Sequence, residues 1–571
     1  MRWGAATAVV AAILVAGVMC EGPNSAAAQA LRPEELTPRT GVPEELGPEP
    51  PVGEGLEEEA APAPGGPTFA LEGVRFEGST QFDDDALAAA AAEWIGEAVT
   101  LADLRAIARR VERRYRDAGF VATRVLVPPQ TVTDGVVTFR VVEGFVANVV
   151  VRGEVGPAQR QVERYLGRIR DERPLRLATV ERYLLLARDL PGISVRGTLR
   201  AAPEPEAVGG IDLVVDVARK RFDAYANLEN GRSEATGPWA AGLFGRANSF
   251  APQAQTVDVL GLVSLDVDEL QIGRVGYRQQ LGAEGTNVQA SFTFGRSEPS
   301  ERFSVFDVET ESRLFEVAVE HPLIRTRERS LYLEGGLDVV SQEQDQRFQR
   351  TEDELRILRL GTRLRARDPL DLGRYTGFNE FDLELRQGLD LFGASAPDDD
   401  PAPPNLSRPN ADPQALVLRA GWVRRQPVAG PVSLRLEFRG QWTDDPLAAF
   451  EEFSLGNLTI GRGYSPGAAF GDRGWAFSGE VQYRPPVRWR PARLDRLELF
   501  GFYDVGETFE VDSPRGVSDG DQLSSAGAGV RLRLFERFYA EATWAHPFDE
   551  ELSQTTEEFG DEFLFRFTAL Y

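Results

Sequence analysis

The chain of 571 residues has few of the side chains on which many enzymes and metal proteins depend. Lysine occurs once, at Lys220, cysteine once, at Cys20, and histidine twice, at His321 and His546. A Walker-type phosphate loop needs a lysine between glycine and serine or threonine, and Lys220 lies between two arginines. One cysteine and two distant histidines do not offer the ligand set of a His/Cys metal site. We therefore expect no catalytic, cofactor-binding or metal-binding residues, and no enzyme.

The chain also has fewer basic than acidic residues, and it has few long apolar runs. The chain has 89 acidic and 63 basic residues, which gives a net charge of -26. A surface of this sign repels the phosphate backbone, so the composition argues against a nucleic-acid partner. Past the N-terminus, no segment offers about 18 consecutive apolar residues, so we expect no transmembrane helix.

The N-terminus is typical of an exported protein. A basic start precedes an apolar run from Ala5 to Met19, and small residues follow at Ala28 and Ala30 in an A-x-A pattern. We therefore expect residues 1–30 to be a signal peptide that is cleaved after Ala30. The mature chain would then contain no cysteine. Residues 31–66, rich in Pro, Glu and Gly, are predicted to be a flexible linker.

Residues 67–220 contain two copies of a small unit with the order β-α-α-β-β. In the first copy, a helix begins behind a cap at Thr100 and keeps apolar residues at helical spacing as far as Tyr115. Gly119 ends this helix, and two paired strands follow. The second copy repeats the order. A repeated unit ahead of a different architecture indicates a modular chain.

From residue 221 onward, helical periodicity gives way to alternation of apolar and polar residues. A representative segment, residues 432–438, alternates Val, Leu, Leu and Phe with Ser, Arg and Glu. About sixteen such segments, each of roughly ten residues, are separated by turn signals. A soluble all-β protein also alternates. The number of segments and the signal peptide favour a transmembrane barrel with lipid outside and a polar lumen inside.

One loop, Thr459 to Gly474, contains five glycines in sixteen residues and places Arg462 between Gly461 and Gly463. So many glycines disfavour both a helix and a regular strand. The spacing G-x-G-x-x-x-G, the interruption by Pro466 and the lack of a following helix exclude a nucleotide-binding loop.

Several motifs resemble those of the outer-membrane transporters of two-partner secretion, the TpsB family typified by the haemolysin and filamentous haemagglutinin transporters. They occur in the family's order: Y-x-x-x-G-F, P-x-Q and V-x-E-G between Tyr115 and Val146, the Asn230-Gly231 pair, I-G-R-G-Y from Ile460 to Tyr464, and F-Y-D-V-G from Phe502 to Gly506. The loop departs slightly from the family's [VI]-R-G-[FY], because a glycine precedes the arginine.

The resemblance implies a mixed fold with two periplasmic α+β POTRA domains and a 16-stranded antiparallel transmembrane β-barrel. The POTRA domains would comprise residues 67–144 and 145–220, and the barrel residues 221–571. A loop at about 443–474 would fold back into the barrel. The implied site residues form a loop anchor and its partners on a strand: Arg462, Gly463, Tyr464 and Phe502, Asp504, Gly506.

The resemblance further implies that Arg462 pairs with Asp504. Alternation supports this independently, because Glu498, Phe502 and Asp504 share one face of their strand. If Asp504 faces the lumen, its carboxylate can accept two hydrogen bonds from the planar guanidinium of Arg462. The alternative, two solvated charges that never meet, stays open here.

The function implied is a translocation pore that recognises an unfolded partner exoprotein through its POTRA domains and secretes it without nucleotide hydrolysis. The exoprotein would dock by β-augmentation on an edge strand beginning at Phe69, Val136 or Ile193. Other expected partners are outer-membrane lipid and the barrel assembly machinery, with the chain working as a monomer. Residues 31–66 are expected to form no long plug helix, only a short turn at Pro33–Leu36. The alternatives are an insertase of the BamA or TamA kind and a general diffusion porin.

Overall fold

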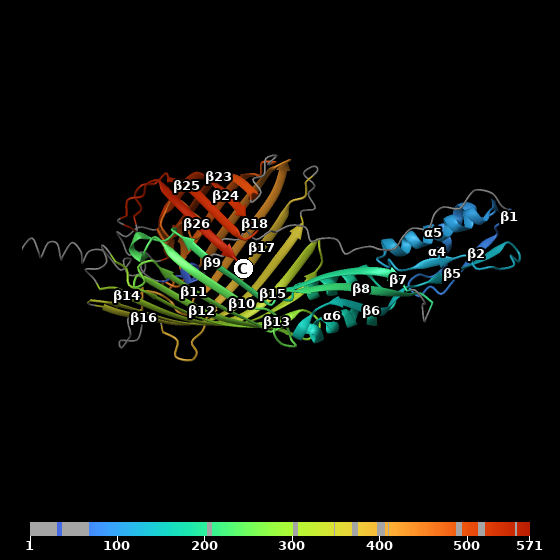
Figure 1. Cartoon of the computed structure of the whole chain (residues 1–571), viewed down its shortest axis with the longest axis horizontal. Coiled ribbons are helices and arrows are strands. Elements are labelled where there is room, and N and C mark those ends of the chain that lie inside the picture. The colour runs from blue at the N-terminus through green and yellow to red at the C-terminus, as the bar shows by residue number, and fades with distance from the viewer. Residues whose placement is uncertain are drawn as a thin grey trace, which may run out of the picture.

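A computed structural model describes residues 31–36, 68–202, 208–300, 307–347, 349–367, 375–396, 406–408, 410–486, 494–511, 520–553, 555 and 557–571. The predicted signal peptide, with Ala28 and Ala30, lies outside the described residues. Two small α/β units extend from one end of a β-barrel, and the first unit lies farther from it (Figure 1). No helix among the described residues is long and apolar enough to cross a membrane.

The first unit combines a three-stranded sheet with helices that cover it. Its elements are β1 (Phe69–Ala70), β2 (Gly73–Glu77), α4 (Asp84–Ala88), η1 (Ala89–Trp94), β3 (Ala98–Val99), α5 (Leu101–Asp117), β4 (Arg124–Leu126) and β5 (Val136–Val142). The sheet order is β2-β5-β4, with β2 parallel to β5. Helix α5 begins with a capping box, in which Thr100 and Asp103 each bond the other's backbone N–H. Its apolar face packs Ile107, Val111 and Tyr115 into the unit's core.

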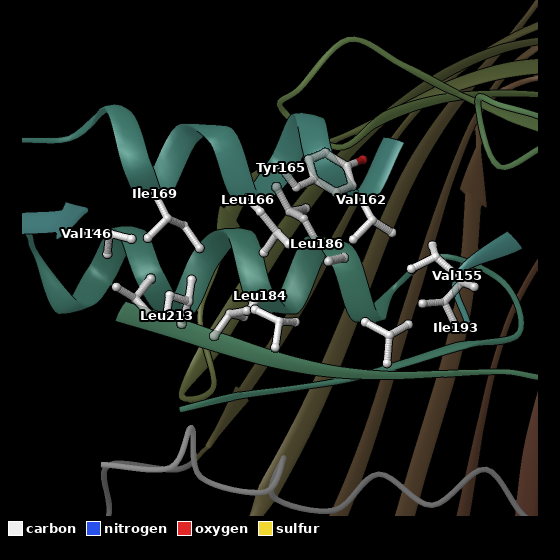
Figure 2. Close-up of a cluster of buried hydrophobic side chains, with 14 of the residues drawn as sticks. Val146, Val155, Val162, Tyr165, Leu166, Ile169, Leu184, Leu186, Ile193 and Leu213 are labelled. Atoms are coloured by element: carbon white, nitrogen blue, oxygen red, sulfur yellow. The ribbon is translucent and has the colours of Figure 1, made fainter. Parts of the chain in front are cut away.

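The second unit repeats this arrangement. Its elements are β6 (Phe145–Gly153), η2 (Gly156–Ala158), α6 (Gln159–Asp171), α7 (Leu177–Arg188), β7 (Ile193–Ala201) and β8 (Gly210–Arg219). The sheet order is β6-β8-β7. The two helices lie side by side, and side chains such as Leu166, Leu184 and Leu213 meet in a shared core (Figure 2).

The sheet orders correct one expectation from the sequence. The strand that begins at Val136, β5, is the central strand of the first unit and pairs with β2 and β4. It is not an edge, because both of its sides are occupied by neighbouring strands. Sequence alternation shows that a segment is a strand but carries no information about its neighbours.

The second half of the chain is a closed barrel of antiparallel strands, which confirms the predicted architecture (Figure 1). Its strands are β9 (Phe222–Glu229), β10 (Ala240–Ala247), β11 (Thr256–Ser264), β12 (Leu270–Leu281), β13 (Thr286–Ser297), β14 (Glu309–Arg325), β15 (Arg329–Gln346), β16 (Gln349–Arg367), β17 (Phe378–Gly388), β18 (Leu416–Ala429), β19 (Val432–Thr443), β22 (Arg473–Tyr483), β23 (Leu494–Phe509), β24 (Gln522–Leu534), β25 (Phe538–Pro547) and β26 (Glu562–Leu570).

The barrel closes where its last strand, β26, pairs with its first, β9. Asn230, in the predicted Asn-Gly motif, donates to the carbonyl of Phe563 at 2.7 Å and so prolongs this seam beyond the end of β9. At the other end of the seam, the only lysine, Lys220, donates to the main-chain oxygen of Tyr571 at 2.8 Å. The seam is therefore held at both ends by side chains.

Side chains alternate between the outside of the barrel and its lumen. On β23, Phe502 and Asp504 are buried inside, whereas Leu499 and Tyr503 are exposed on the outer surface. Closure satisfies the backbone of every strand, and an apolar outer face with a polar interior is what a lipid bilayer requires.

The barrel has two distinct ends. The proximal end carries the second α/β unit, and at the distal end the residues between β19 and β22 form a long loop. This loop contains a small hairpin of β20 (Phe453–Leu455) and β21 (Ala469–Gly471) and is largely buried.

Residues 31–36, predicted to belong to the flexible linker, are instead packed inside the barrel. The helix α3 (Pro33–Leu36) has the bounds of the predicted short turn. Leu31 and Leu36 join an apolar cluster with Ala240 and Leu270, which lie at the distal ends of their strands. The linker prediction, which was based on composition, is wrong for these residues, because the barrel provides an apolar surface against which they pack. Residues 37–66 lie outside the described residues.

Candidate functional site in the barrel lumen

Arg462 and Asp504 meet in the lumen through a two-pronged contact. The Arg462 Nε donates to Asp504 Oδ2 at 2.9 Å, and Nη2 donates to Oδ1 at 2.8 Å. The backbone N–H of Arg462 also donates to Oδ2, at 3.1 Å. The Asp504 carboxylate is 1% exposed, so this contact is shielded from water. Such planar, charge-assisted pairs are among the stronger polar contacts in proteins.

Arg462 makes further contacts in the lumen. Nη1 donates to Glu480 Oε2 at 2.8 Å and Nη2 to Ser478 Oγ at 3.0 Å. The guanidinium carbon lies 3.5 Å from the centre of the Phe502 ring, in a cation–π contact. Three predicted residues, Arg462, Phe502 and Asp504, thus share one site.

Glu480 joins this site to a second arginine that sequence reasoning missed. Arg531 on β24 donates to Glu480 at 2.6 Å, to Glu498 at 2.9 Å and to Glu541 at 2.8 Å. The register of β22 against β23 places Ser478 opposite Asp504. Knowledge of this register would have identified Ser478 and Glu480 as neighbours of Asp504, because their side chains share the lumen face. A single sequence does not reveal the register.

The glycines and the tyrosine of the motifs fit the loop against the barrel wall. A Cβ on Gly463 would lie 3.0 Å from both Pro547 N and Ser525 Cβ, so a larger residue would push the loop away. A Cβ on Gly506 would lie 2.8 Å from Leu455 of the loop. The buried Tyr464 donates its hydroxyl to the carbonyl of Ser524 at 2.8 Å.

A second charged cluster holds the loop near the distal end. Arg408 forms ion pairs with Glu452, Asp472 and Glu510, and its distance to Glu452 is 3.2 Å. The three carboxylates lie close enough together to ligate a metal ion. Because the Arg408 guanidinium already pairs with all three, they act here as an anchor for the loop.

The N-terminal segment binds to this same cluster. Arg32 Nη2 donates to Glu452 Oε2 at 3.1 Å, and its guanidinium carbon lies 4.6 Å from the centre of the Phe470 ring. Glu34 accepts a hydrogen bond from Ser454. The segment and the loop therefore occupy the distal lumen together.

The second α/β unit is bound to the proximal turns of the barrel. Asp189 accepts two hydrogen bonds from Arg325, at 2.8 and 2.7 Å. Tyr183 lies 3.0 Å from the Glu284 carboxylate, and burial, with that carboxylate, raises the pKa of Tyr183. The Tyr183 hydroxyl therefore remains a donor across the physiological pH range.

Asp189→Ala is expected to loosen this interface. The guanidinium of Arg325, 7% exposed, would lose both of its bonds to the second unit. Trypsin should then cleave the second unit several-fold faster, with the barrel itself unaffected. Asp171→Ala is the matched control, because among the described residues Asp171 pairs only with the adjacent Arg170 on the surface. Equal cleavage rates for the two variants would contradict the expectation.

Comparison with known proteins supplies a family context. Residues 69–144 match the POTRA domain of the ShlB type, and residues 209–532 match the haemolysin secretion/activation protein ShlB/FhaC/HecB. The heme/hemopexin transporter protein HuxB of Haemophilus influenzae is 22% identical over 478 residues, which cover 82% of this chain and 81% of HuxB.

Solved structures share the whole fold. CdiB from Escherichia coli is 16% identical with a TM-score of 0.72, and the match covers 96% of this chain and 95% of CdiB. CdiB from Acinetobacter baumannii is 14% identical with a TM-score of 0.61, covering 94% and 95%. BamA from Haemophilus ducreyi lacking POTRA domains 1–3 is 11% identical with a TM-score of 0.51, covering 88% and 100%.

Proposed function

We propose that this chain, which belongs to the haemolysin secretion/activation protein family ShlB/FhaC/HecB, receives an unfolded exoprotein on strand β7 and passes it through the barrel without nucleotide hydrolysis. Members of this family are transporters, and the chain is accordingly an outer-membrane translocation pore for partner exoproteins with its POTRA domain in the periplasm. We further propose that β7 is the docking strand and that transport is passive, without a catalytic step. The residues assigned a role in transport are part of the same proposal.

The observation that carries the docking proposal is the difference between the sheet edges. In the first unit, the edge strand β2 has its Phe76 N–H bonded to Asp84 Oδ1 at 2.7 Å. The opposite edge, β4, has its Val125 N–H bonded to Glu112 Oε1 at 2.8 Å. These carboxylates occupy main-chain donors that an incoming strand would need, and both edge strands are short.

The second unit offers a longer and more regular edge. Strand β7 pairs with β8 over nine residues without a register shift. The opposite edge, β6, has an irregularity between Val146 and Asn148, of the kind that discourages further pairing. Among the described residues, β7 has no other strand beside it, which favours it for β-augmentation.

Cross-linking can test β7 as the docking strand. Arg196→Cys places a thiol on an exposed position of β7, and Arg75→Cys places one on an exposed position of the blocked edge β2. We expect a stalled exoprotein to cross-link strongly at position 196 and weakly at position 75. Equal yields at both positions, or none at 196, would rule out β7.

The overall function has its own test. Deletion of the gene should leave the partner exoprotein in the periplasm, and unchanged exoprotein in the medium would refute the proposal. If the proteins of the outer membrane were depleted instead, an insertase function of the BamA kind would be favoured.

Further partners follow from the surface of the barrel. Large apolar side chains such as Leu243, Val259 and Leu358 are exposed on its outside, which suits contact with outer-membrane lipid. Its strands are inserted, we propose, by the barrel assembly machinery. Because one chain closes its own barrel, we propose that the protein works as a monomer.

A further inference from the structure

A cavity of about 320 Å³ opens at the proximal end of the lumen. Its lining runs from Pro191, in the second α/β unit, to the inner faces of β10 to β16. Pro191 lies two residues before the start of strand β7 in the chain. The cavity therefore lies where a chain leaving β7 would enter the barrel.

Three arginines form one wall of this cavity: Arg246 on β10, and Arg274 and Arg278 on β12. Two carboxylates stand opposite Arg246 in the strand pairing, Asp223 and Asp258, and Asp223 is also paired with Lys220 at 2.9 Å, so the three arginines outnumber the carboxylates beside them. Arg274 reaches a carboxylate, that of Asp258, at 4.0 Å, and Arg278 donates to the neutral Gln289 at 2.8 Å. Arg246 lies 5.1 Å from the centre of the Phe244 ring, and its buried Nε has no hydrogen-bond partner in the described part of the chain.

The opposite wall is different, because its arginines are neutralised. Arg359 pairs with Asp338 at 2.8 Å and with Glu334 at 3.2 Å, and Arg363 pairs with Asp382 at 3.1 Å. The excess positive charge is thus confined to the β10–β12 wall. It is surrounded by a protein whose net charge is -26 and which would otherwise repel an acidic chain.

We propose that this wall is a binding site for the carboxylate side chains of an acidic segment in the unfolded exoprotein. Guanidinium groups match carboxylates in both charge and geometry, and these have donors to spare. The volume accommodates a short stretch of extended chain rather than a folded domain. This inference rests on the proposed function and adds the chemistry of the segment that enters first.

Binding of short labelled peptides to the purified full-length protein tests the site without requiring secretion. A glutamate-rich peptide should bind more tightly than a lysine-rich peptide of the same length. Its affinity should fall steeply between about 50 and 500 mM KCl, since salt screens partly solvated charges. A lysine-rich peptide that bound equally well would overturn the proposal.

Substitution of the three arginines locates the binding. The combined change Arg246→Gln, Arg274→Gln and Arg278→Gln should weaken the glutamate-rich peptide by about tenfold, if each contact has the strength typical of a partly exposed ion pair. Arg439→Gln is the control, because Arg439 lies outside the cavity and is paired with Glu437 at 3.0 Å. The combined Arg→Lys variant keeps the charge, so it should retain most of the binding and show that the barrel is folded.

The outcomes separate this inference from the proposed function. If the Gln variant binds as tightly as the natural chain while gene deletion still blocks secretion, the cavity site is refuted and the transporter function stands. If the peptide binds as expected but secretion survives deletion, the function is refuted instead. Inorganic phosphate can be added so that its concentration of negative charge equals that of the peptide. If it then competes with the peptide, the wall binds anions generally, and the assignment to an acidic polypeptide fails.

Discussion

Arg462→Ala is expected to reduce secretion of the exoprotein by at least about tenfold while the barrel still assembles. The substitution would leave Asp504 and Glu480, which are 1% and 2% exposed, without their shared cation. Breaking a buried ion pair by removing one partner typically costs about 3–5 kcal/mol, so we expect the loop to leave its position. Exoprotein in the medium measures transport, and heat-modifiable migration in gel electrophoresis measures assembly.

Two further variants distinguish a paired role from separate roles. Asp504→Ala should resemble Arg462→Ala, and the double variant should be no worse than either single one, because each change breaks the same contact. Arg462→Lys should remain defective, since an ammonium group lacks the planar fork that bonds Asp504 and Glu480 together. Arg439→Ala, at an arginine of the lumen outside this site, is the control. Strictly additive defects would show that Arg462 and Asp504 act independently.

Deletion of residues 31–36 is expected to increase the conductance of the purified protein in planar bilayers several-fold. The segment occupies the distal lumen, where Leu31 and Leu36 are 1% and 2% exposed, and no described element replaces it. Arg32→Ala should give part of this effect, because the buried Glu452 would lose one of the two arginines that pair with it among the described residues.

The control for this deletion is Arg75→Ala, which removes an exposed arginine from the first unit, away from the lumen. It should leave the conductance unchanged. If removal of residues 31–36 also leaves the conductance unchanged, the loop alone closes the pore and the segment serves only to steady it. Large antibiotics that enter cells carrying the deletion, but not cells carrying the control, would show in vivo that residues 31–36 help to close the pore.

Much of the architecture follows from periodicity and composition. Helical spacing from Leu104 to Tyr115 predicted α5, and alternation at positions such as Phe502 and Asp504 predicted which side chains lie inside the barrel. These patterns are local, because the period of a helix or a strand decides which side chains share a face. The glycines around Arg462 also predicted a loop, since so many glycines disfavour both a helix and a regular strand.

The predictions that failed concern partners distant in sequence. The strand at Val136 was offered as an edge, but the sheet places it in the centre, and the linker assignment overlooked that Leu31 and Leu36 would find an apolar surface on the barrel. Similarly, nothing in the sequence near Arg462 identified Glu480, or the second arginine that Glu480 binds.

Local periodicity therefore predicted two α/β units and a barrel with a polar lumen, and the resemblance of the motif around Arg462 implied a loop that folds inward. Only the tertiary structure decided which sheet edge is open, what fills the distal lumen and which arginines at the proximal end outnumber the carboxylates beside them. The physical reason is that backbone periodicity depends on neighbours along the chain, whereas pairing, burial and neutralisation of charge depend on residues that closure of the barrel brings together.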